Sequence, residues 1–156
     1  MSRMYSIPFS GVAVTAQQDF FEILAATAKP CKVHSIEIEQ STEVGDAQEE
    51  GLSILLKRGV GSTTGSGGTT PTPVTQDVSD VAAGLVGKVN NTTKMTVGTI
   101  TLLRAWVWNV RIPFFKMFTP ETRPAILPGD RLTVELATTP ADSITINGTM
   151  MVEEIS

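Results

Sequence analysis

The chain has 156 residues, of which 41 % are hydrophobic and 18 % are charged. A chain of this length and composition supports one domain with its own core, so a wholly disordered protein is excluded. Its 12 basic residues are outnumbered by 16 acidic ones, giving a net charge of −4. Nucleic acid is therefore an unsuitable partner, because its binding depends on basic patches.

Residues 1–8 at the start of the chain are polar and contain a proline. A secretory signal would instead have a charged start followed by a long apolar run, so we expect a protein made and kept in the cytoplasm. The longest apolar stretch, residues 100–110, is interrupted by Arg104 and Asn109 and is shorter than the roughly 18 residues of a membrane span. We therefore expect no membrane partner.

Short runs rich in Val, Ile, Thr and Phe, bounded by Gly, Pro, Asn and Asp, predict an almost entirely β protein. Several runs alternate in the manner of a half-buried sheet, with His34, Ile36 and Ile38 expected on one face and Glu37 and Glu39 on the other. In chain order, the predicted strands are residues 5–14, 19–24, 31–39, 51–58, 78–83, 95–108, 112–118, 131–137 and 143–153.

The connections between these strands predict how the sheets are joined. Residues 59–73 form a tract of Gly, Ser, Thr and Pro with almost no apolar side chain, which predicts a long exposed loop inside one domain. Short strands joined by at least one long crossover predict a two-sheet antiparallel sandwich of jelly-roll type. An immunoglobulin-like sandwich is the alternative, although the paired cysteines around a tryptophan are missing.

The sequence offers few groups for catalysis. Cys31 is the single cysteine and His34 the single histidine, and residues three apart on a strand point to opposite faces, which argues against a Cys–His dyad. The glycine-rich residues 59–68 lack the Gly-Lys-Ser/Thr that a phosphate-binding loop requires. His34 is interpreted as a core or interface residue rather than a catalytic base.

A cluster of carboxylates near the middle of the chain could supply oxygen ligands to a hard cation. Its spacing is not that of an EF-hand, so we interpret it as a solvated acidic loop with at most one helical turn over residues 45–50. The residues are Glu43, Asp46, Glu49 and Glu50. We therefore expect no catalytic residue, no metal site and no cofactor, and thus a protein that is not an enzyme.

Two neighbouring strands are apolar on both faces. Residues 102–110 place two tryptophans on one side and aliphatic residues on the other, and residues 112–118 repeat the pattern with phenylalanine and methionine. A sandwich buries one face of each sheet, so the second face needs a cover. Either the Gly/Ser/Thr loop folds over it or, as we favour, it is a subunit interface. The residues proposed for the core and this interface are Trp106, Trp108, Phe114, Phe115 and Phe118.

Several segments, taken together, resemble a group of small phage proteins over nearly the whole chain. They are Tyr5-Ser6-Ile7-Pro8-Phe9 continuing to Val14, Gln17-Gln18-Asp19-Phe20-Phe21-Glu22-Ile23, His34-Ser35-Ile36 followed by Gln40-Ser41, the Thr-Pro-Thr-Pro loop at 70–73, and Ala141-Asp142-Ser143 leading to Gly148-Thr149 and Glu153-Glu154-Ile155. In these features the chain resembles the trimeric jelly-roll cement, or decoration, proteins of tailed-phage heads.

The resemblance implies a structural virion protein, made in the host cytoplasm, that binds the major capsid protein on the outer head surface as a homotrimer and stabilises the shell. It also suggests a division of the chain into an N-terminal arm, residues 1–8, and a single jelly-roll domain, residues 9–156, with residues 59–73 touching the shell or solvent. The expected capsid-contacting arm residues are Arg3, Met4, Tyr5, Ile7 and Pro8.

Two other functions remain open from the sequence. A jelly-roll module of a phage tail, baseplate or fibre would bind a host carbohydrate or protein. A cupin-like or glycan-active β-barrel enzyme would need metal ligands, and the single histidine argues against it.

Overall fold

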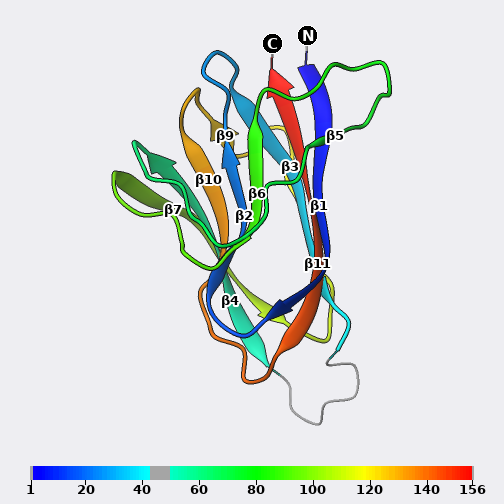
Figure 1. Cartoon of the computed structure of the whole chain (residues 1–156), viewed down its shortest axis with the longest axis vertical. Helices are drawn as coiled ribbons and strands as arrows, with labels where there is room; N and C mark the ends of the chain where they lie inside the picture. Colours follow the sequence, from blue (N-terminus) through cyan, green and yellow to red (C-terminus); the bar gives the residue numbers. More distant parts are fainter. Residues whose placement is uncertain (1, 43–49, 156) are drawn as a thin grey trace.

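The computed structural model describes residues 2–42 and 50–155, and this part of the chain contains strands and loops but no helix. Two antiparallel sheets pack face to face, which confirms the predicted all-β sandwich of jelly-roll type (Figure 1). The strands are β1 (Ser2–Val14), β2 (Gln18–Leu24), β3 (Cys31–Gln40), β4 (Gly51–Val60), β5 (Val74–Thr75), β6 (Val86–Asn91), β7 (Thr99–Asn109), β8 (Phe114–Met117), β9 (Ala125–Ile126), β10 (Arg131–Leu136) and β11 (Ile144–Ile155).

Within the described residues, the first sheet has the order β5-β1-β11-β3-β8, with β9 also paired to β3. The second sheet has the order β6-β2-β10-β4-β7. Neighbours in each sheet are seldom consecutive in the chain, so most connections cross from one sheet to the other. As a result β7 and β8, which are close in sequence, end up as edge strands of different sheets.

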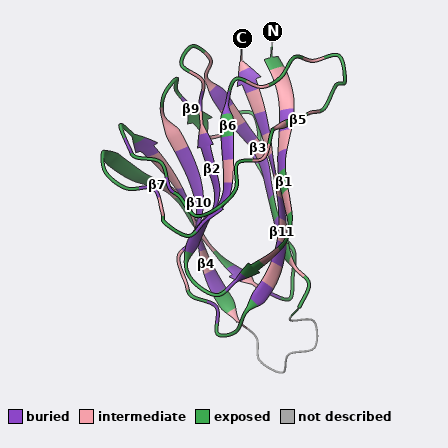
Figure 2. Ribbon diagram, in the orientation of Figure 1, coloured by how far each residue is buried: buried purple, intermediate pink, exposed green. Residues whose placement is uncertain are grey.

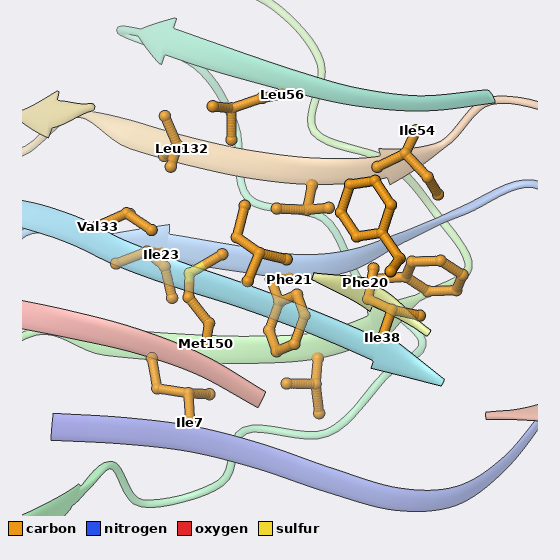
Figure 3. Packing of buried hydrophobic residues seen from close by; sticks show 14 of the residues in the cluster. Ile7, Phe20, Phe21, Ile23, Val33, Ile38, Ile54, Leu56, Leu132 and Met150 are labelled. Carbon is orange, nitrogen blue, oxygen red and sulfur yellow. The ribbon is translucent and has the colours of Figure 1, made fainter. Parts of the chain in front are cut away.

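Alternate side chains of both sheets fill the space between them. Figure 3 shows Ile7, Val33 and Met150 of the first sheet facing Phe21 and Ile23 of the second. All of these side chains are completely buried, and Figure 2 shows the buried positions concentrated along the inner strands. Burial of this apolar surface is the main favourable term in the stability of the fold.

Two predicted strands were placed wrongly for local reasons. Residues 78–83 form a turn and loop, and the strand of this region is β6, which begins at Val86. Within β6, a Cβ at Gly87 would lie 2.7 Å from a side-chain carbon of Ile7, so packing explains the glycine. The strand predicted to begin at 95 starts at Thr99, because Val97 and Gly98 adopt positive φ angles of 63° and 65°.

The bulge in β3 changes which residues face the core. The pairing with β11 skips one residue between Val33 and Ser35, so Val33 joins Ile36 and Ile38 on the buried face. His34 was predicted to share that face, and this was wrong. It is half-buried and forms an ion pair with Glu153 instead.

Residues 2–8 are not an N-terminal arm, and this correction affects the proposed contacts with a shell. They form the first half of β1 and pair with β11 from Ser2 onward, with Tyr5 and Ile7 completely buried. The alternation of buried and accessible residues is that of a strand in a sheet. β5 pairs only with Tyr5 and Ser6, so exposed Pro8 lies beyond that pairing, where a missing N–H is tolerated.

The predicted loop at 59–73 is shorter and less free than expected. Gly59 and Val60 belong to β4, and the segment that follows makes backbone bridges from Thr63, Ser66 and Thr69. These bridges join it to residues 89–96 rather than leaving it in solvent. The helical turn considered at 45–50 and most of the acidic cluster lie outside the described residues.

If residues 2–8 are part of the core sheet, Ile7→Ala must destabilise the protein. We expect the free energy of unfolding to fall by about 2–5 kcal/mol, because the substitution leaves a cavity between β1 and β6. Chemical denaturation measures this change. Val78→Ala, at a completely exposed valine, is the control and is expected to change stability by less than about 0.5 kcal/mol. Equal stability of both variants would support an arm instead.

Candidate functional site

The aromatic residues proposed for a subunit interface are mostly inside the protein. Trp108, Phe114 and Phe118 are buried in the core, and Trp106 is partly buried against it. The indole Nε1 of Trp108 donates a hydrogen bond to the carbonyl oxygen of Ile112 at 2.8 Å, which fixes the turn after β7. Of the five aromatic residues, only Phe115 has a largely accessible side chain, with 47 % exposed. The prediction that these residues contribute to the core is therefore confirmed for Trp108, Phe114 and Phe118, and their burial is at odds with a place for the same three in a subunit contact.

These aromatic side chains close the open side of the sandwich between β7 and β8. The ring of Trp106 contacts Phe114 edge-on at a centroid distance of 5.6 Å and lies 6.4 Å from the ring of Phe118. The ammonium of Lys116 lies 5.4 Å from the Phe114 ring and 5.9 Å from the Trp106 ring. The two edge strands are thus held together by aromatic and cation–π contacts, with a charge at the rim.

The outward-facing residues of the same two strands form the strongest candidate surface. Val107 on β7 is 74 % exposed and Met117 on β8 is 73 % exposed. Figure 2 shows most of β7 as exposed or intermediate. Exposed apolar side chains that gather on neighbouring elements indicate an interaction site, whereas single ones do not. We call this group the edge stripe; it consists of Ile100, Leu102, Val107, Ile112, Phe115 and Met117.

The edge stripe includes a shallow hollow of about 240 Å³ at the turn between β7 and β8. Val107, Ile112 and Phe115 supply its apolar wall, and Asn109 and Lys116 supply polar groups. The tryptophan and the other phenylalanine that line it have their rings in the core.

The residues once expected in a capsid-contacting arm serve a different purpose. The Arg3 guanidinium bonds the Asp80 carboxylate at 3.2 Å, and the Tyr5 hydroxyl donates to the carbonyl oxygen of Val81 at 3.0 Å. These contacts fix the loop that joins β5 to β6 beside the two chain ends (Figure 1). Met4 is half-buried, Ile7 is buried and Pro8 is exposed on the strand. None of these residues projects as part of a free arm.

A buried polar layer covers the outer face of the second sheet. The Glu22 carboxylate on β2 accepts hydrogen bonds from the Thr64 hydroxyl at 2.8 Å, from the Gly65 amide at 2.8 Å and from the Asn91 side chain at 3.0 Å. The Arg131 Nε lies 3.4 Å from the same carboxylate. The Gly/Ser/Thr loop therefore folds over β2 and β10, and not over the edge stripe.

Two further carboxylates belong to this polar layer. Glu135 on β10 accepts hydrogen bonds from Lys57 and from Lys94, the latter at 2.7 Å, and these lysines keep its pKa below the ordinary value despite its burial. Asp19 on β2 accepts a hydrogen bond from the Met95 amide at 2.9 Å, and burial raises its pKa to about 7. Sequence analysis did not select these residues, because their partners lie on segments distant in the chain.

Three further titratable side chains in the described part of the chain are each buried or hydrogen-bonded within the protein. Cys31 is buried, and burial raises its pKa to about 12, so the thiol stays protonated. Hydrogen bonding from His34, 2.8 Å away, lowers the pKa of Glu153. Glu154 faces the other way and accepts hydrogen bonds from the amides of Gly84 and Leu85, each at 2.8 Å.

The described part of the chain contains neither a metal-binding cluster nor a membrane-spanning helix. Among residues 2–42 and 50–155, no group of three or more His, Cys, Asp or Glu side chains is arranged to hold a metal ion. In the same residues, no helix has the length and apolar character needed to cross a bilayer. Glu43, Asp46 and Glu49, considered above as cation ligands, lie outside these ranges.

Comparisons with known proteins do not assign a family. No family model matches the chain, and no curated protein matches its sequence significantly. One solved structure, described as the crystal structure of the T13 IBDV viral particle, contains a chain with 17 % identity. The match covers 99 % of this chain and 39 % of that one, with a TM-score of 0.16. A likeness this weak carries no argument about function.

The polar layer predicts that Glu22→Gln is destabilising. An amide nitrogen would replace one carboxylate oxygen and face N–H or O–H donors, so we expect a loss of about 1–3 kcal/mol in the free energy of unfolding. Denaturation measures the loss, and hydrogen exchange at residues 64–66 locates it. Glu37→Gln, at an exposed position on β3, is the matched control. Similar stabilities for both variants would show that Glu22 does not hold the loop.

Proposed function

We propose that this chain is a structural virion protein that decorates the outer surface of a phage head as a homotrimer and stabilises the shell. The observation that carries the proposal is the edge stripe, which gathers exposed aliphatic, aromatic and methionine side chains at one side of a rigid sandwich. Methionine and aromatic residues are enriched at protein interfaces. The resemblance of the sequence to trimeric cement proteins agrees with such a role.

The arrangement of the edge stripe is compatible with a head-to-tail ring, as the proposed trimer requires. The side chains on β7 extend from the second sheet and those on β8 extend from the first, so the stripe has two unlike halves. One half can pack on the other half of a neighbouring copy, which is a head-to-tail contact. Contacts of this kind close into a ring when the rotation permits, and three copies form the smallest ring.

A decoration protein needs a rigid scaffold and binding surfaces rather than an active site. The described residues supply buried or ion-paired titratable groups and no metal-binding cluster. Three linked copies would engage several capsid subunits at once, so modest contacts combine into strong binding. Binding only to the assembled shell would then stabilise it by mass action. The acidic net charge of −4 suits a surface facing away from packaged DNA.

The first test is the solution mass of the purified protein by light scattering after size exclusion. We expect about three times the chain mass of 16.7 kDa. Val107→Asp places a charge in a dry contact, which costs more than 1.4 kcal/mol, so we expect the trimer to dissociate at concentrations at least about tenfold higher than for the wild type.

The matched control is Val78→Asp, which makes the same change at a completely exposed valine outside the edge stripe. It is expected to remain trimeric. A wild-type monomer, or equal dissociation of both variants, would contradict the proposed self-association surface.

The second test uses heads of the phage that encodes this protein, purified so that they lack it. Purified protein is added to these heads, and its binding is measured. We expect wild-type protein to cosediment with the heads and to raise the temperature at which they release DNA. Val107→Asp is expected to bind less at the same concentration because avidity is lost. A protein that leaves the heads bare but binds in a glycan array would instead be the tail, baseplate or fibre module considered from the sequence.

A further inference from the structure

Asp19 lies beneath residues 92–98, in the most enclosed part of the polar layer. Its side chain is almost completely buried, and one carboxylate oxygen accepts the hydrogen bond from the Met95 amide. Met95 is itself buried, and its sulfur lies close to Gly59 of β4. The carboxyl group therefore sits between β2 and the segment above it, at a point where water is excluded.

Residues 92–98 are held by hydrogen bonds to the Gly/Ser/Thr loop and to the second sheet, and they include strained backbone. Backbone hydrogen bonds join Thr93 to Ser66 and the Thr96 carbonyl oxygen to the Thr63 amide. Val97 adopts a φ of 63°, which is unfavourable for a β-branched residue, and its side chain is 66 % exposed. The exposed Val97 side chain makes little packing contact to offset this strain. The position of the segment therefore depends on its contacts with the second sheet below it.

The charges around Asp19 make its ionised form costly. Glu22 on the same strand and Glu135 on β10 are both negative groups that act on it, and Lys94 of the covering segment is the positive one. Lys94 already bonds Glu135, as Lys57 of β4 does, and Arg131 of β10 pairs with Glu22. On the β6 side the residue paired with Asp19 is the neutral Asn91. An ionised Asp19 would be the third negative charge in this layer, and the neighbouring cations already pair with the other two.

We propose that Asp19 is a pH-sensitive latch: its neutral carboxyl group keeps residues 92–98 seated on the second sheet, and its ionisation loosens them. The protonated group retains a carbonyl oxygen that accepts the Met95 hydrogen bond. The ionised group is stabilised by hydration, which requires the segment to lift. This inference goes beyond the proposed virion role and does not depend on it.

The direction of the pH dependence follows from the burial of Asp19. Its pKa rises from 3.8 to about 7 in the folded protein, so between these values the folded state binds a proton that the unfolded state has released. Stability contributed by this group is therefore greatest at low pH and falls as the pH rises toward 7. Local opening of residues 92–98 exposes the ionised carboxylate to water and so removes part of the cost of burying its charge, without unfolding the domain.

The segment of the latch leads directly into the strand that carries half of the edge stripe. Thr99, the first residue of β7, follows directly after the segment, and Ile100 and Leu102 come next. Backbone contact between Gly98 and Val60 links the turn to the end of β4.

Hydrogen–deuterium exchange of the wild-type chain at pH 5.5, 6.5, 7.5 and 8.5 tests the latch. After correction for intrinsic exchange rates, we expect protection of residues 92–98 to fall by at least about tenfold across this range. Asp19→Asn keeps an oxygen that accepts the Met95 hydrogen bond and removes the charge, so its protection is expected to stay high. Asp142→Asn, at an exposed turn position, is the matched control and is expected to follow the wild type.

Equal pH profiles for the wild type and Asp19→Asn would overturn the proposal. So would protection that is independent of pH in both proteins. If Asp19→Asn does not fold, the proposal is tested in the wild type instead. The chemical shift of the Asp19 carboxyl carbon is then followed by NMR as the pH is changed. A midpoint between about pH 6 and 8, with amide shifts at residues 94–98 that follow it, supports the latch; a midpoint below pH 5 refutes it.

Discussion

The second sheet is buried on both faces at β2 and β10, and much of the molecule follows from this constraint. A strand covered on one side by the opposite sheet and on the other by loops has no access to water for its polar groups. Every polar side chain at such positions must find a partner inside the protein. Glu22 and Glu135 find theirs among amides, hydroxyls and cations that loops bring to the sheet. Buried carboxylates thus determine where the Gly/Ser/Thr loop and residues 92–98 lie.

The same loops leave the β7 edge of the second sheet uncovered. The loops extend over β2 and β10, while β7 at the edge keeps Leu102 and Val107 accessible. Lys116 lies across the rings of Trp106 and Phe114 at the adjacent edge. A charge at the rim opposes indiscriminate pairing of an edge strand with other chains. The edge therefore combines an apolar surface with a feature that limits what can bind to it.

The candidate site shows which of its features a sequence pattern can predict. Alternation on residues 102–110 identified a strand that is apolar on both faces, and β7 has this character. The pattern could not say which face of β7 meets the core. Trp106 and Trp108 turn inward toward β8, and Val107 turns outward. That choice depends on the opposite sheet, because large rings are stabilised where a second apolar surface receives them.

The polar layer had no comparable signal in the sequence. Asp19 and Glu22 are separated from their partners Met95 and Gly65 by more than forty residues along the chain. Glu135 alternates with apolar neighbours as a solvent-facing residue would, and only the lysines that reach it from β4 and residue 94 show that it is covered. A period of two marks a face as polar but does not show whether water or protein meets it.

The β class, the two-sheet sandwich and most strand positions follow from local sequence patterns, because alternation and turn residues act within a few neighbours. Tertiary structure decided that the strand predicted from residue 5 begins at Ser2 and belongs to the core sheet rather than to an arm, because Tyr5 and Ile7 gain their burial from β11 and β6. It also decided which aromatic rings are core and which carboxylates are enclosed. Burial and the energy of a charge depend on what the fold brings from distant parts of the chain, and a local pattern does not contain that information.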